Sequence, residues 1–199
     1  MRQFIRAITL TLVLFVIVGV AYPLAGVALS QVVFHGQANG SIAKNGSSLI
    51  GQPWSNLTAT DPKIDARWFQ GRPDLDNPLG LQYPGGTMSS GESQQANLGP
   101  RSQGLVDDVA AMVKLWKAAG VDDPTPDLVT TSGSELDPDI TPQDATVQIS
   151  MVLAARPYLT QTQLEDLVAD NTVSPQLGFL GGPYINVLQL NEALAALPR

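Results

Sequence analysis

The sequence predicts an α+β protein: a single N-terminal transmembrane helix followed by one small mixed α/β extracytoplasmic domain. Two observations carry this prediction. A long apolar run near the N-terminus has no charge, and the rest of the chain alternates irregularly between short strand-like and helix-like patterns. The 199 residues are enough for one domain of ordinary size. We expect four parts: a cytoplasmic N-terminus (1–6), a transmembrane anchor (7–34), a tether (35–46) and the domain (47–199).

The predicted anchor contains no charged side chain between residues 7 and 34. Its span covers residues 8–29, with Ile8 and Leu29 at its ends. At about 1.5 Å per residue this helix crosses the roughly 30 Å of hydrocarbon in a bilayer. Pro23 and Gly26 predict a kink near its outer end. A cleaved signal peptide is the alternative, but its apolar region would be about 7–15 residues long and would precede an Ala-x-Ala site. We therefore expect an uncleaved anchor in membrane lipid.

Basic residues predict the direction of the anchor. Arg2 and Arg6 precede the apolar run, and the next basic residue is Lys44. Because positive charge is retained on the cytoplasmic side, we expect the N-terminus in the cytoplasm and the domain on the outer side of the membrane. The predicted topology is thus single-pass, with an exported domain.

Charge and composition exclude several functions for the domain. All 18 acidic residues follow His35, together with nine of the 11 basic ones, which gives this part a formal charge of −9. Such a domain cannot neutralise phosphates, so nucleic acid is not an expected partner. The chain has no cysteine, which excludes a disulfide, a thiol nucleophile and a zinc–thiolate site.

The first half of the domain contains one clear helix. Residues 47–50 are typical of a short strand, and Trp68, Phe69 and Tyr83 are expected to anchor the segment that follows. Residues 84–100 form a long loop without periodicity. An apolar stripe then predicts a helix whose one face packs in the core; it consists of Leu105, Val106, Val109, Met112, Val113 and Trp116.

Capping signals organise the second half. Residues 127–131 are strand-like. Thr141 is the expected N-cap of a helix that Pro157 ends after Arg156. Thr160 and Gln163 form a capping-box pattern at the start of another helix. Residues 184–194 are expected to pass from a short strand into a terminal helix.

No residue pattern predicts catalysis, metal binding or cofactor binding. His35 is the only histidine and lies where the anchor ends. No nucleophile–base motif or phosphate-binding loop is visible. Asp137 and Asp139 resemble a fragment of a calcium loop without its other ligands, so we interpret them as part of a turn before Thr141.

A set of short motifs resembles the family of C subunits of the Kdp potassium-transporting P-type ATPase. The longest is the segment 127–142, DLVTTSGSELDPDITP. Shorter matches follow the family's order behind a single anchor: residues 48–52, 69–73, 97–100, 155–156 and 186–194. The chain departs from the family pattern at Asp74, Glu135, Asp139 and Met151.

The resemblance implies a single-pass subunit of a complex in the bacterial inner membrane, with its domain in the periplasm, that is not catalytic by itself. Its partners would be a channel-like potassium-translocating subunit, a P-type ATPase subunit and a very small single-helix subunit. ATP and Mg²⁺ would bind the ATPase subunit and not this chain. The family is also credited with raising the ATP affinity of the pump, which the predicted topology makes an indirect effect.

Two loops are the candidate contacts with the channel-like subunit, because loops on a rigid scaffold commonly carry recognition. Their alternative role is to shape turns that support the fold. Two other functions stay open on the residues alone: an anchored periplasmic hydrolase, and an anchored binding or adhesion module unrelated to transport. The candidate contacts are Asn97, Leu98, Gly99, Pro100, Arg101, Ser132, Gly133, Ser134, Asp137 and Pro138.

Overall fold

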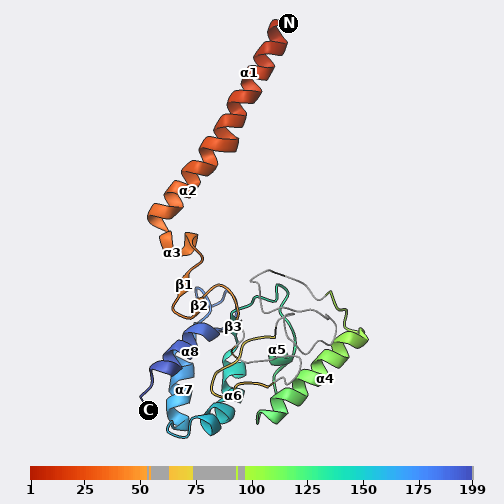
Figure 1. Cartoon of the computed structure of the whole chain (residues 1–199), viewed down its shortest axis with the longest axis vertical. Helices are drawn as coiled ribbons and strands as arrows, with labels where there is room; N and C mark the ends of the chain where they lie inside the picture. Colours follow the sequence, from red (N-terminus) through yellow and green to blue (C-terminus); the bar gives the residue numbers. More distant parts are fainter. Residues whose placement is uncertain (53, 55–62, 74–92, 94–96, 199) are drawn as a thin grey trace. The chain divides into compact units, whose positions relative to one another are not determined.

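Two units make up the chain in the computed structural model, Met1–Ile42 and Ala43–Arg199. The structure describes residues 1–52, 54, 63–73, 93 and 97–198. Figure 1 shows the first unit as a long helix and the second as a set of shorter helices with very short strands. The fold class predicted from the sequence, one N-terminal apolar helix and a small α+β domain, is confirmed.

The first unit is built on one long apolar helix. It consists of α1 (Arg2–Val16), a π-helical turn (Ile17–Ala21) and α2 (Tyr22–Val33). Over 32 residues it is long and apolar enough to cross a membrane. The helix continues through Pro23, and the irregular turn precedes this residue. Proline has no N–H for the carbonyl of Gly19, which favours a local change of helix type.

A short helix and a hairpin follow the long helix. The turn α3 comprises His35–Ala38, and β1 (Ile42–Ala43) pairs with β2 (Gly46–Ser47). The predicted strand over 47–50 is therefore wrong. The pairing is instead set by the two-residue turn Lys44–Asn45 before Gly46, whose φ of 150° lies in the left-handed region.

The helix α4 (Gln103–Ala118) confirms the helix predicted from the apolar stripe. Met112 and Trp116 are buried on it, and Val109 and Val113 pack against the core, whereas Val106 is 54% exposed. Most of the predicted stripe therefore faces the core. The indole N–H of Trp116 donates to the carbonyl of Leu128, 2.8 Å away. Gly120, with φ of 92°, follows the end of the helix.

The strand predicted over 127–131 is wrong, because α5 (Pro126–Val129) is a helical turn. Pro126 at its first position has the φ of a helix start, and Leu128 and Val129 are buried at its end. The strand β3 (Asp139–Ile140) follows and pairs antiparallel with β4 (Ile185–Asn186).

Three helices complete the core, and all three were predicted. Capping boxes at Thr141 and Thr160 open α6 (Pro142–Ala155) and α7 (Gln161–Asp170), and β4 leads directly into α8 (Val187–Ala196). Figure 1 shows these helices gathered together, with α4 along the other side of the unit. The core joins them through fully buried side chains, among them Phe69, Leu128, Met151, Leu164, Ile185, Leu190 and Leu194.

Candidate functional site

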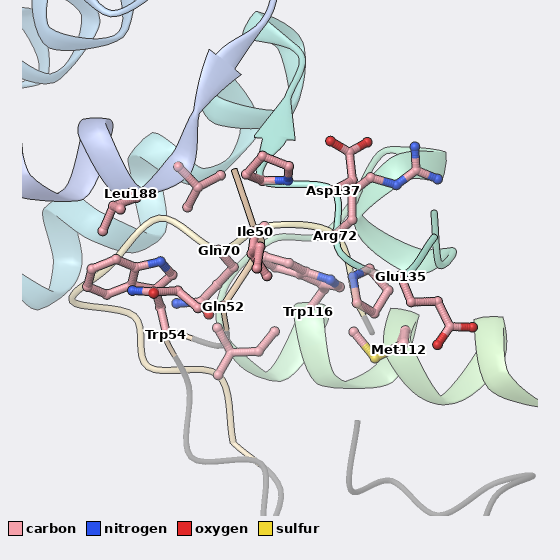
Figure 2. Close-up of a pocket in the computed structure, with 16 residues that line it drawn as sticks. Ile50, Gln52, Trp54, Gln70, Arg72, Met112, Trp116, Glu135, Asp137 and Leu188 are labelled. Carbon is pink, nitrogen blue, oxygen red and sulfur yellow. The ribbon is translucent and has the colours of Figure 1, made fainter. Parts of the chain in front are cut away.

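A pocket that is partly open to solvent forms where distant segments of the second unit meet. It is lined by residues 50–52, Trp54 and Ile64, by residues 70–73, by Glu135, Asp137 and Pro138, by residues 187–188, and by Met112 and Trp116 of α4. Figure 2 shows Trp54 and Leu188 on one side, and Arg72, Glu135 and Asp137 on the other. Four of the motif segments identified in the sequence thus contribute to one pocket. Its apolar lining includes Ile50, Trp54, Ile64, Met112, Trp116, Val187 and Leu188.

Two buried amide side chains hold one wall of the pocket. Asn191 of α8 accepts from the N–H of Phe69 at 2.9 Å and donates to its carbonyl at 2.8 Å. Gln148 of α6 does the same for Gln70, at 2.7 and 3.1 Å. Both amides have 0% exposure. They pair with the extended backbone as a neighbouring strand would, which satisfies polar groups that are cut off from water.

A close approach of two backbones holds the next wall. The N–H of Gly51 donates to the carbonyl of Leu136 at 2.8 Å. A Cβ atom at Gly51 would lie 2.6 Å from the carbonyl oxygen of Asp137, so the contact requires glycine. The segment of residues 48–52 is therefore packed directly on the loop that precedes β3.

Asn186 ties the same two segments to the start of α8. Its amide nitrogen donates to the carbonyl of Ser48 at 2.9 Å and to the Asp139 carboxylate at 3.0 Å. Its side-chain oxygen accepts from the N–H of Gln189 at 3.2 Å and so caps α8. One side chain thereby fixes the position of both segments relative to the helix.

Charged groups around the pocket are mostly engaged by neighbours. Arg72 pairs with Asp127 at 3.2 Å and donates to the carbonyl of Thr131 at 3.0 Å. Burial raises the pKa of the Asp139 carboxyl; Asn186 opposes this shift, and the nearby Asp137 adds to it. The hydrogen bond from Arg67 lowers the pKa of Asp65, at 2.6 Å from the guanidinium.

An aromatic stack extends from the pocket to α6. The rings of Trp54 and Trp68 are 5.3 Å apart and tilted by 40°. The guanidinium of Arg156 lies 4.7 Å from the centre of the Trp68 ring, and its Nε donates to the carbonyl of Arg67 at 2.8 Å. The end of α6 is thus joined to the segment that carries Phe69.

The structure separates the candidate contact residues into exposed and lining positions. Asn97, Gly99, Pro100 and Arg101 are exposed before α4, and Leu98 is half-buried. Gly133 and Ser134 are exposed, whereas Ser132 is buried. Asp137 and Pro138 line the pocket. In the first unit, Ile8 of α1 and Leu29 of α2 have exposed side chains.

Sequence reasoning missed the residues that build the pocket wall. Gln148 and Asn191 lie at positions of apolar helix faces, and a polar residue at such a position was the available signal. Gly51 and Arg72 fall within motifs quoted for the resemblance, but no contact was predicted for either. Residues 53, 55–62, 74–92 and 94–96 lie outside the described part, and with them Tyr83 and most of the predicted loop 84–100.

The described pocket residues offer binding groups and no obvious reaction chemistry. Its ionisable side chains are those of Arg72, Glu135 and Asp137, and none of the described lining residues is His, Ser, Thr, Cys or Lys. No group of three or more His, Cys, Asp or Glu in the described residues could hold a metal ion. The described lining is that of a mostly apolar recess with a few polar groups.

Comparison with known proteins identifies the family. A family model described as "K+-transporting ATPase, c chain" (KdpC) matches residues 4–196. A potassium-transporting ATPase KdpC subunit of Burkholderia vietnamiensis is 43% identical over 206 residues, which cover 98% of this chain and 97% of the relative. KdpC subunits of Allorhizobium ampelinum and Rhodopseudomonas palustris are 39% and 38% identical, over 96% and 98% of this chain and 94% and 98% of their own lengths. The chain therefore belongs to the KdpC family, the c chains of K⁺-transporting ATPases.

Proposed function

We propose that this chain is a non-catalytic accessory subunit of an ATP-driven potassium uptake pump in a bacterial inner membrane. The observation that carries the proposal is its similarity, over nearly the whole length, to proteins named potassium-transporting ATPase KdpC subunits. The lining of its pocket supports a binding role, because the described residues there include no nucleophile paired with a base. Other subunits would thus hydrolyse ATP and translocate potassium.

The chain would assemble with a channel-like potassium-translocating subunit and a P-type ATPase subunit, and stabilise both. A very small single-helix subunit would complete the complex. ATP and Mg²⁺ would bind the ATPase subunit alone. In this scheme the exposed segment before α4, with Asn97 and Arg101, and the exposed Gly133 and Ser134 provide contacts with the channel-like subunit.

The orientation separates this domain from ATP. Arg2 and Arg6 favour a cytoplasmic N-terminus, which leaves the second unit in the periplasm. Hydrolysis of ATP takes place on the cytoplasmic side. An effect of this chain on the ATP affinity of the pump would therefore be indirect, through coupled conformations of the subunits.

Co-purification tests the proposal. The full chain with a C-terminal tag is expressed with the remaining genes for the pump, extracted in mild detergent and recovered on the tag. We expect the channel-like and P-type subunits in the eluate, and lower amounts of both in cells that lack this chain. Recovery of the tagged chain without a P-type ATPase would refute the proposal.

The same preparation tests the indirect effect on ATP. The complex and a complex depleted of this chain are compared for the ATP concentration that gives half-maximal hydrolysis. We expect depletion to raise this concentration. Cross-linking of a photoreactive ATP analogue to this chain would contradict an indirect effect.

A further inference from the structure

The loop between α7 and β4, residues 173–184, gathers the exposed apolar side chains of the second unit. Five of the eight large apolar residues that are exposed in the described part of this unit lie within it. Leu177 is 82% exposed, Phe179 74% and Leu180 49%. Isolated exposed apolar side chains are ordinary, but several within one short loop indicate an interaction surface.

The loop is held in one shape by its own backbone. Val173 and Tyr184 exchange two hydrogen bonds, at 2.8 and 3.1 Å, and Gln176 and Leu180 exchange two more, at 3.0 and 2.9 Å. Leu177 has a φ of 53°, in the left-handed region that a leucine rarely adopts. Leu177 thus combines a strained backbone with an exposed side chain, and the four hydrogen bonds hold the loop in this conformation. A surface that is ordered in advance loses less entropy on binding.

The loop is also without charge. No charged residue occurs between Asn171 and Asn191, in a part of the chain with a formal charge of −9. The cores of protein interfaces are depleted of charge and enriched in aromatic residues. Burial of this loop would remove apolar surface from water without removing an ion from water.

Unpaired backbone groups favour a protein over lipid as the occupant. The N–H groups of Leu177, Gly181 and Gly182 have no hydrogen-bond acceptor within the described chain. Hydrocarbon offers no acceptor, and irregular backbone is not found exposed to it. A protein surface can supply carbonyl or side-chain oxygens.

We propose that residues 173–184 dock into an uncharged, apolar recess on another subunit of the potassium-transporting ATPase, whose backbone carbonyls accept from the N–H groups of the loop. This inference rests on the proposed function, because it presupposes that the chain assembles with such subunits. It adds the segment and the chemistry of the contact.

The first test is co-purification with a triple variant, Leu177→Ser with Phe179→Ser and Leu180→Ser, in the full chain. The matched control is Leu49→Ser with Val106→Ser, which removes apolar side chains that are 58% and 54% exposed elsewhere in the unit. We expect the triple variant to recover at least about tenfold less of the other subunits, and the control to recover as much as the unmodified chain. The melting temperature of either variant should match that of the parent.

Equal recovery by the triple variant and the parent overturns the inference and leaves the proposed function intact. If the parent itself recovers no other subunit, the proposed function fails first, so the two failures are distinguishable. If the triple variant and the control lose recovery of the other subunits equally, the inference is also overturned, because the effect would not be specific to the loop.

A second measurement does not depend on a multiple variant. Since the chain has no cysteine, Phe179→Cys provides one labelling site for a polarity-sensitive fluorophore. The labelled full chain is placed in lipid nanodiscs. We expect the emission to shift to the blue when the other subunits are present, and not with lipid or with unlabelled copies of this chain alone. A shift with lipid alone assigns the loop to the membrane, a shift with copies of this chain assigns it to self-association, and either overturns the proposal.

Discussion

At the level of residues, a few amide side chains join distant segments of the second unit by hydrogen bonds. Asn191 and Gln148 replace strand partners for Phe69 and Gln70, and Asn186 joins two loops to a helix. A buried amide that is fully bonded stabilises one arrangement and penalises others, because any shift leaves polar groups unpaired. The segments around the pocket are therefore held by specific pairs, in addition to the apolar core.

Gly51 supports the first prediction at this scale. We expect Gly51→Ala to destabilise the protein by about 1–3 kcal/mol, because its Cβ would lie 2.6 Å from the Asp137 carbonyl oxygen and backbone would have to move. Thermal unfolding measures the loss. Gly133→Ala is the control, since no atom lies within 4 Å of a Cβ at that position. Equal melting temperatures for Gly51→Ala and the parent would show that residues 48–52 can move away from the loop before β3 without loss of stability.

Asp139 gives a prediction of pH dependence. Its folded pKa is raised above the ordinary 3.8, so the protonated carboxyl is favoured in the folded state. The stability that it contributes is fully present below 3.8 and is lost as the pH rises through the folded pKa. Asp139→Asn should therefore melt above the parent at pH 7, and this difference should shrink as the pH falls toward 3.8.

The measurement for Asp139 is a series of melting curves from pH 7 to pH 4. Asn can still accept from Asn186, so the 3.0 Å contact is retained in the variant. Asp166→Asn, at an exposed position of α7, serves as the control for a generic change in net charge. A difference between Asp139→Asn and the parent that does not change with pH would contradict the burial of this carboxylate as its cause.

At the level of elements, the sequence predicted where helices begin better than it predicted strands. Thr141, Thr160 and the segment 184–194 were correctly predicted because capping is local: a hydroxyl and an N–H three residues apart suffice. The strands predicted over 47–50 and 127–131 were wrong. Ile50 lines the pocket, and the side chain of Leu128 is buried in the core. A short apolar run does not distinguish such positions from a strand.

The pocket itself could not be predicted from local patterns. Its walls come from segments more than 100 residues apart in sequence, such as Gly51 and Leu188. The resemblance identified these segments as belonging together, but spacing alone gives no indication that they meet. Asn191 illustrates the difficulty, because its partner Phe69 is 122 residues away.

The capping box of α7 gives a prediction at the level of elements. We expect Thr160→Ala to cost about 1 kcal/mol, which for a domain of this size lowers the melting temperature by about 2–4 °C. The hydroxyl of Thr160 accepts from the N–H of Gln163 at 3.2 Å, and alanine cannot. Thr160→Ser should retain the stability of the parent. Thr146→Ala, within α6, is the helix-interior control and should not lower it; a similar loss there would show that the cap is not the cause.

At the level of the whole molecule, membrane attachment and charge act together. The helix Arg2–Val33 can span a bilayer, and the part of the chain behind His35 carries a formal charge of −9. An acidic domain is repelled by anionic headgroups, so attachment would depend on the helix. The chain would then meet the other subunits by diffusion in the plane of the membrane.

The orientation of the helix is the last prediction. Arg2 and Arg6 precede it without any basic residue before Lys44, so the N-terminus should stay in the cytoplasm. Ala110, exposed on α4, is replaced by cysteine in this cysteine-free chain and treated with a membrane-impermeant maleimide. We expect labelling in intact spheroplasts. Arg2→Glu with Arg6→Glu should reduce it, because the charge asymmetry that orients the helix is removed. Labelling of Ala110→Cys only after lysis would reverse the topology, place the second unit beside the ATP-hydrolysing side of the pump, and make a direct contact with nucleotide the simpler explanation of any effect on ATP affinity.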